Sequence, residues 1–250
     1  MATTRTEPAL PVLPNGDATT PACWSCGDMR AANFCNACGK VQPPAPTDFF
    51  SFFGLPRKLT IDTAVLEREM YALSRRLHPD VYARASEAEQ GWSLEQTSKL
   101  NDAYRTLRDP ILRTEYLLKL EGVKSAEASK LATEQARTTG QKKQAVPPEL
   151  LEEVFELNMQ LEEYRGSEHD RALHRELEEA RENFQQKLDA ATAELRDCWR
   201  EWDALITRAE QGESVAGDER RRALDHMVGV LNRRRYIDHL LREISAALVE

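Results

Sequence analysis

The chain has 250 residues, a formal net charge of −8 and a hydrophobic fraction of 41%. This length favours two domains over one, and the apolar content is sufficient for globular cores. The acidic balance, without a strongly basic segment, argues against a nucleic-acid partner, because phosphate binding needs a basic surface. No apolar stretch approaches the roughly 20 residues that span a bilayer, so no membrane partner is expected.

Residues 1–20 are rich in Thr, Pro and Ala and are predicted to form a disordered tail. They contain a single basic residue, Arg5, and two acidic residues, Glu7 and Asp17. A mitochondrial transit peptide is rich in Arg and poor in acids, and a secretory signal has an apolar core. We therefore expect neither kind of signal in this segment.

Residues 21–42 contain four of the five cysteines. They are arranged as two C-x2-C pairs: Cys23, Cys26, Cys35 and Cys38. Each pair can direct two thiolates at one ion, and four thiolates complete a closed tetrahedral site with no position left for a substrate. The pattern predicts a structural zinc knuckle, with two disulfides or free thiols as the alternatives.

A short proline-rich segment, VQPPAPTD from Val41 to Asp48, follows the cysteines. We expect this linker to make few contacts with the rest of the chain. Loss of the metal should then unfold residues 21–40 and leave the following domain folded.

Residues 48–121 have helical periodicity. Asp62 is the expected N-cap of a long helix that the proline at position 79 ends. The apolar face of this helix is formed by Leu66, Met70, Leu73 and Leu77. A second helix is predicted over residues 85–107, and an Asp-Pro pair at residue 109 predicts the start of a third.

The C-terminal part has a polar linker at residues 122–146, followed by three amphipathic stretches in residues 147–250. The first helix is expected to start near Glu149 and to carry an apolar stripe through Leu150, Val154, Leu157 and Leu161. The second and third run through residues 173–205 and 223–248. Three such helices predict a bundle, with Cys198 as a core residue.

The loop between the first two long helices begins with His-Pro-Asp, and this antiparallel hairpin resembles a J domain. The preceding helix also bears three arginines on its polar side. The resemblance implies a chaperone-binding set composed of His78, Pro79, Asp80, Arg68, Arg75 and Arg76. A loop that only caps a helix, beside solvated arginines, is the alternative.

Longer segments resemble the HscB family of iron–sulfur cluster co-chaperones: DFFSFFGLP, LHPD, KLNDAYRTLRDPILRTEYLLKLEGV and LLEEVFELNMQLEE. The match runs from about residue 47 to the end, and the paired cysteines ahead of it are similar to animal-type members. The resemblance implies an L-shaped, all-α protein with a J domain and a C-terminal three-helix domain. It implies two partners, a DnaK-type chaperone of the heat-shock protein 70 family and the iron–sulfur cluster scaffold protein.

Under this resemblance the chain is not an enzyme, but delivers the scaffold to the chaperone and stimulates the ATPase of the chaperone. The resemblance implies the mitochondrial matrix, with the cytoplasm as the alternative because no clear presequence is found. The oligomeric state is not predicted, and both a monomer and a homodimer are compatible with the resemblance.

The resemblance also implies a scaffold-binding patch. Leu151, Phe155 and Tyr236 each lie one residue away from an apolar stripe, about 100° around their helices. HscB-like proteins bind the scaffold with aliphatic and aromatic residues at the matching positions, and Glu152 departs from the apolar residue often found there. A wide stripe that buries all three residues in the bundle is the alternative.

Two other functions are compatible with parts of the sequence. A general J protein for unfolded clients usually has a Gly/Phe-rich linker and C-x2-C-x-G-x-G repeats, and neither is present. A zinc-knuckle nucleic-acid adaptor is disfavoured by the charge distribution. The sequence contains no phosphate-binding glycine loop and no nucleophile elbow.

Overall fold

The computed structural model describes residues 22–28, 33–123, 147–166 and 170–249. The predicted tail at residues 1–20 and nearly all of the predicted linker at 122–146 lie outside the described residues. Helices and turns make up the described part, with one isolated β-bridge between Phe34 and Val41. The prediction of an all-α protein is confirmed.

The chain divides into two compact units, and the division differs from the predicted domain boundaries. The first unit comprises Met1–Arg57 and Ile61–Arg113, so the cysteine segment and the helical hairpin fall in one unit. The second comprises Lys58–Thr60 and Thr114–Glu250. Helix α4, Pro110–Leu120, passes from one unit into the other.

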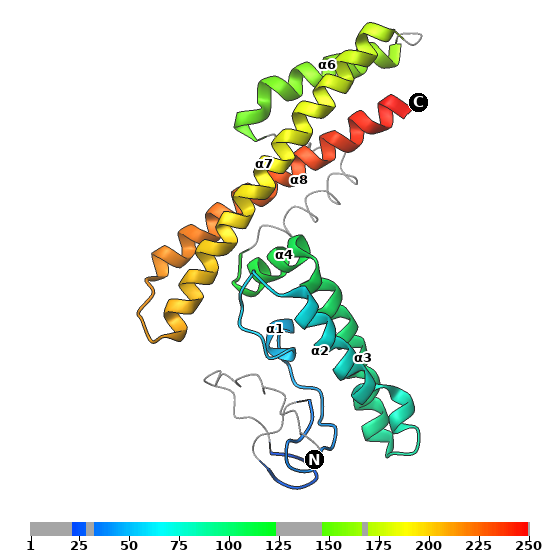
Figure 1. Cartoon of the computed structure of the whole chain (residues 1–250), viewed down its shortest axis with the longest axis vertical. Coiled ribbons are helices and arrows are strands. Elements are labelled where there is room, and N and C mark those ends of the chain that lie inside the picture. The colour runs from blue at the N-terminus through cyan, green and yellow to red at the C-terminus, as the bar shows by residue number, and fades with distance from the viewer. Residues whose placement is uncertain (1–21, 29–32, 124–146, 167–169, 250) are drawn as a thin grey trace, which may run out of the picture. The chain divides into compact units, whose positions relative to one another are not determined.

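The first unit is built on two long helices, α2 at Thr63–Leu77 and α3 at Glu87–Arg108, which pack side by side (Figure 1). A short helix, α1 at Phe49–Phe52, packs on α3, and a 3-10 turn, η1 at Pro79–Tyr82, joins the long helices. The Asp62 carboxylate caps α2 as predicted, accepting hydrogen bonds from the backbone N–H groups of residues 64 and 65.

Two details of the first unit differ from expectation. Helix α3 begins two residues later than predicted because Ser86 and Glu89 form a capping box that fixes its first turn. Helix α1 was not predicted, since its four residues are too few to show helical periodicity. Asp48 caps α1 through a hydrogen bond from the Ser51 N–H.

The second unit contains the predicted three-helix bundle: α6 at Leu151–Gly166, α7 at Arg171–Glu210 and α8 at Gly217–Val249. Helices α7 and α8 form a long pair, and α6 packs mainly on α7 (Figure 1). The segment Lys58–Thr60 belongs to this unit because the Asp203 carboxylate accepts hydrogen bonds from the N–H groups of Leu59 (2.6 Å) and Thr60 (2.8 Å).

The core of the bundle is a continuous apolar cluster between the three helices. Its members include the predicted stripe of the first helix and residues of the other two: Leu150, Val154, Leu157, Leu161, Leu177, Phe184, Ile237 and Ile244. Within the described residues, no helix is both long enough and apolar enough to cross a membrane.

Candidate functional site

The His-Pro-Asp loop lies at the end of α2. Pro79 cannot continue that helix, so His78 adopts an extended backbone and Pro79 opens η1. The Nδ1 atom of His78 accepts a hydrogen bond from the Asp80 N–H at 3.2 Å and lies 3.6 Å from the Asp80 carboxylate. Because the two side chains are 54% and 92% exposed, core packing does not explain their presence.

Two hydroxyl groups of α3 hold the end of α2. The Leu77 carbonyl accepts hydrogen bonds from Ser93 Oγ at 2.6 Å and from Thr97 Oγ1 at 3.0 Å. The last carbonyls of a helix have no partner within it, so these bonds fix the residue directly before the loop. We did not single out this Ser-Thr pair in the sequence, although its spacing of four on one face of α3 could have indicated it.

The arginines predicted to face the chaperone are solvent-exposed on α2: Arg68, Arg75 and Arg76. One of them also has a partner within the first unit. The guanidinium carbon of Arg76 lies 3.8 Å from the centroid of the Phe34 ring, in the cysteine segment.

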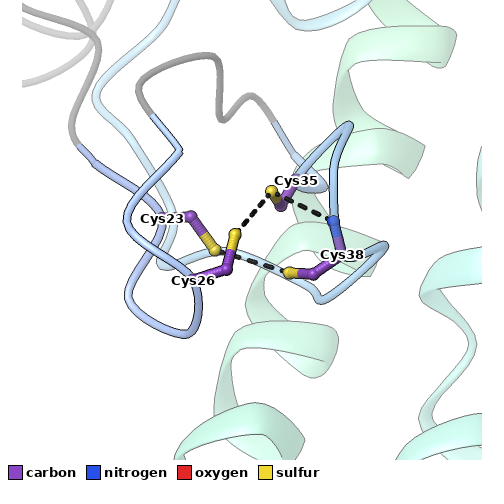
Figure 2. A group of neighbouring side chains, drawn as sticks. All are labelled: Cys23, Cys26, Cys35 and Cys38. Carbon is purple, nitrogen blue, oxygen red and sulfur yellow. Dashed lines mark hydrogen bonds between the residues drawn. The ribbon is translucent and has the colours of Figure 1, made fainter.

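The four predicted metal ligands converge in space (Figure 2). Their sulfur atoms all lie within 4.8 Å of one another. The distances are 3.6 Å for Cys23–Cys38 and 3.5 Å for Cys26–Cys35, far longer than the roughly 2.0 Å of a disulfide. A single ion could contact all four sulfurs, so the donor set fits a thiolate-bound metal.

The two cysteine turns have the same backbone geometry. In each, the N–H of the glycine after the second cysteine donates to the carbonyl of the first, Gly27 to Cys23 (2.9 Å) and Gly39 to Cys35 (2.8 Å). Both glycines have positive φ, 78° and 73°, which side chains disfavour. The repeated turn directs the two thiols of each pair toward the same point.

The thiols titrate differently. Burial raises the pKa of Cys23, but N–H donors from Cys26 and Ser25, with the neighbouring thiols, lower it to about 6. The N–H of Asp28 lowers the pKa of Cys26, but the adjoining thiols, that of Cys35 first, raise it to about 12. A bound cation would supply the positive charge that stabilises four thiolates at such short distances.

The expectation that the proline-rich linker makes few contacts is wrong. The Gln42 carbonyl accepts a hydrogen bond from the buried Gln96 side chain of α3 at 2.6 Å, and Gln42 Nε2 lies 3.3 Å from Cys23 Sγ. Lys99 Nζ donates to the carbonyl of Ala45 at 2.9 Å. The physical reason is that Gln42 is buried, so its carbonyl needs a hydrogen-bond partner, which the Gln96 side chain supplies.

The cysteine segment itself also packs on α3. The Trp24 ring meets the Trp92 ring edge to face, with centroids 5.5 Å apart, and its Nε1–H donates to the Val41 carbonyl at 2.7 Å. The metal knuckle is therefore part of the first unit and not an appended module.

An apolar strip lies on the exposed side of α6. Leu151 is 54% exposed, Phe155 69% and Met159 57%, and the three are spaced by four residues, so they are neighbours on one face. We call these three residues the α6 patch. Met159 was not named from the sequence, although its spacing from Phe155 could have indicated it.

Tyr236 does not belong to this patch. It is 7% exposed and lies in the apolar core of the bundle, and burial raises the pKa of its hydroxyl. The alternative, in which a wide stripe buries this residue, is therefore right for Tyr236 and wrong for Leu151 and Phe155. Tyr236 packs among the core residues contributed by α6, α7 and α8, whereas Leu151 and Phe155 lie on the exposed face of α6.

The fifth cysteine lies on α7 of the second unit. Cys198 is buried as predicted, and burial raises the pKa of its thiol to about 11. Within the part of the chain that the structure describes, the four clustered cysteines are the only group able to hold a metal ion.

Several known co-chaperones are similar to this chain in sequence. No protein-family model matches the chain. It is 38% identical over 161 residues to the co-chaperone protein HscB homolog of Bordetella avium, and the alignment covers 64% of this chain and 86% of that protein. The chain belongs to the HscB co-chaperone family.

Animal members of the HscB family are also similar. The iron-sulfur cluster co-chaperone protein HscB of Mus musculus is 38% identical over 120 residues, or 46% of this chain. The alignment spans about half of the mouse protein, 51% of its length. The crystal structure of human co-chaperone protein HscB superimposes with a TM-score of 0.54 at 25% identity, covering 90% of this chain and 98% of that one.

Proposed function

We propose that this HscB-family chain is a J-type co-chaperone that binds an iron–sulfur cluster scaffold protein and delivers it to a DnaK-type chaperone, whose ATPase it stimulates. The observation that carries the proposal is the pair of exposed features that packing leaves unexplained. One is the His-Pro-Asp loop in the first unit, and the other is the α6 patch in the second.

The first unit would bind the chaperone. Arg68 and Arg75 lie exposed on α2 and would attract an acidic surface, which speeds encounter and sets orientation. The His78–Asp80 loop would then contact the chaperone and favour its ATP-hydrolysing state. The hydrogen bonds from Ser93 and Thr97 would hold this loop in place relative to α3.

The second unit would bind the scaffold through the α6 patch. Contiguous apolar side chains on a polar helix face mark interaction sites, because solvent exposure of large apolar groups is otherwise unfavourable. With both proteins bound to one chain, the scaffold reaches the chaperone at a high effective concentration. The role of this chain would be to bring two proteins together, without chemistry of its own.

The metal would be zinc in a structural role. Cys23, Cys26, Cys35 and Cys38 provide four sulfur donors, and a site of this composition is closed to substrates. The mitochondrial matrix remains the predicted compartment, with the cytoplasm as the alternative, and fractionation of cells would decide between them.

Substitution His78→Gln tests the proposed function. The exposed side chain contributes little to the core, so the variant should fold and bind the scaffold normally. It should lose stimulation of a purified DnaK-type chaperone, measured as single-turnover ATP hydrolysis, because the loop would no longer engage the chaperone. Wild-type stimulation by the variant would contradict the J-domain function. Stimulation by the wild type that unfolded clients enhance and the scaffold does not would instead favour a general co-chaperone.

A further inference from the structure

The cysteine segment contacts both helix ends that carry the His-Pro-Asp loop. On the first side, Phe34 lies beneath the guanidinium of Arg76, 3.8 Å from ring centroid to carbon, in the last turn of α2. Phe34 is 7% exposed, directly precedes the metal ligand Cys35 and forms the β-bridge with Val41. The metal turn therefore fixes the position of this ring.

On the second side, Lys40 binds the first turn of α3. Its Nζ lies 2.9 Å from Glu89 Oε1, and it follows the glycine of the second cysteine turn. The other oxygen of Glu89 accepts hydrogen bonds from the N–H and Oγ of Ser86, which completes the capping box. Since Glu89 is only 6% exposed, Lys40 provides a charge partner for a buried carboxylate, and its hydrogen bond holds the pKa of Glu89 low.

The loop lies between these two contacts. Burial raises the pKa of Tyr82, the last residue of η1, and the charges of Arg76, Glu89 and Lys40 all act on its hydroxyl. These three charged groups therefore lie near Tyr82, at the end of the turn that carries the His-Pro-Asp motif. One comes from α2, one from α3 and one from the cysteine segment.

We propose that Phe34 and Lys40 are positioning residues that couple metal binding to the chaperone-binding loop. This inference rests on the proposed function. The bound metal orders the second cysteine turn, Phe34 then restrains Arg76, and Lys40 restrains the start of α3. Occupancy of the metal site thus sets how well ordered the loop is before it meets the chaperone.

The exposure of Arg76 supports this role. A guanidinium placed over an aromatic ring keeps its edge donors free, so Arg76 can stack on Phe34 and still bind an acidic partner. Restraining a long side chain in advance reduces the entropy lost on binding. Each such side chain changes affinity by about two- to tenfold.

The experiment compares four single variants of the 250-residue chain with the wild type. Phe34→Leu keeps an apolar side chain but removes the aromatic ring, whereas the control Phe34→Tyr keeps the ring. Lys40→Met keeps the aliphatic stem but removes the charge, whereas the control Lys40→Arg keeps the charge. Metal content is measured for each variant, and the wild type is also measured after removal of zinc by a chelator.

Two readouts separate positioning from structural support. In titrations of a purified DnaK-type chaperone, Phe34→Leu and Lys40→Met should raise the concentration for half-maximal ATPase stimulation about two- to tenfold and leave the maximum unchanged. Backbone hydrogen exchange of residues 76–89 should become faster in both, with metal content unchanged. Phe34→Tyr and Lys40→Arg should match the wild type in both readouts. Removal of zinc from the wild type should speed the exchange of residues 76–89 at least as much as Phe34→Leu or Lys40→Met does.

Several outcomes would overturn the proposal. The first is that both Phe34→Leu and Lys40→Met leave the exchange rate and the half-maximal concentration unchanged. The second is that Phe34→Leu lowers the half-maximal concentration, which would mean that the ring withholds Arg76 from the chaperone. If Phe34→Leu loses its metal, its result does not separate positioning from structural support, and Lys40→Met then decides the question. The Lys40 side chain is half exposed, so its substitution should leave the metal turn folded. If the wild type fails to stimulate, the proposed function fails, and the exchange data still decide whether the knuckle orders the loop.

Discussion

Tyr236 and Phe155 show how far two residues with similar sequence surroundings can differ. Each is an aromatic residue one position away from an apolar stripe, yet Tyr236 is 7% exposed and Phe155 is 69% exposed. Their side chains have different neighbours: Tyr236 packs within the bundle core, whereas Phe155 lies on the outer side of α6. Truncation of Tyr236 should therefore lower stability, whereas truncation of Phe155 should weaken binding and leave stability nearly unchanged.

We predict that Tyr236→Ala lowers the free energy of unfolding of the second unit by about 3–5 kcal/mol, because the truncation leaves a cavity in a packed core. Phe155→Ala should change the same quantity by no more than about 0.5 kcal/mol, since its side chain is exposed. Chemical denaturation followed by circular dichroism measures both values. Equal losses of stability would mean that the assignment of core and surface is wrong.

At the scale of elements, α6 combines two faces with different tasks. One face carries the buried residues Val154, Leu157 and Leu161, which hold the helix in the bundle. The other carries the α6 patch among exposed glutamates. A single helix can do both because residues at spacings of three and four share a face, and a shift of one residue leads to the next face.

The combined substitution of Leu151, Phe155 and Met159 by Ala should weaken scaffold binding by more than about 2 kcal/mol, roughly 30-fold, if the patch is a hot spot. Isothermal titration calorimetry with the purified scaffold measures the change. Val249→Ala is a matched control, because this apolar side chain is 87% exposed on the same unit but lies outside the patch. Unchanged affinity of the triple variant would place the scaffold site elsewhere.

At the scale of the whole molecule, the cysteine segment packs with the helical hairpin in one compact unit. Gln96, Trp92 and Glu89 of α3 all contact the cysteine segment or its linker. The metal site should therefore contribute to the stability of the first unit as a whole. This replaces the expectation that loss of metal would unfold residues 21–40 alone.

We predict one zinc ion per chain, measured by elemental analysis. Substitution Cys35→Ser should release the metal and lower the thermal midpoint of the first unit, because the contacts of Gln42, Trp24 and Lys40 with α3 depend on an ordered knuckle. The second unit should melt as before. A midpoint of the first unit that does not change would show that its helices are stable without the knuckle, and visible absorption of a cluster would exclude zinc.

The features of this protein that depend only on neighbouring residues could be predicted from its sequence. The two C-x2-C pairs identify the four cysteines whose sulfurs could hold one ion, because the chelating geometry lies within each short turn. Asp62 identifies the start of α2, because an N-cap acts on N–H groups only two or three residues away. Pro79 identifies the end of α2, because a proline cannot continue the helix and disfavours helical geometry at the residue before it.

Only the tertiary structure decided which residues meet across elements. Burial of Tyr236, the contact of Phe34 with Arg76 and the bond of Gln96 to the linker each depend on partners distant in the chain. Periodicity indicates that a helix has an apolar face but not how wide the covered part of that face is. The width depends on which neighbours pack against it, and those neighbours are fixed by the fold as a whole.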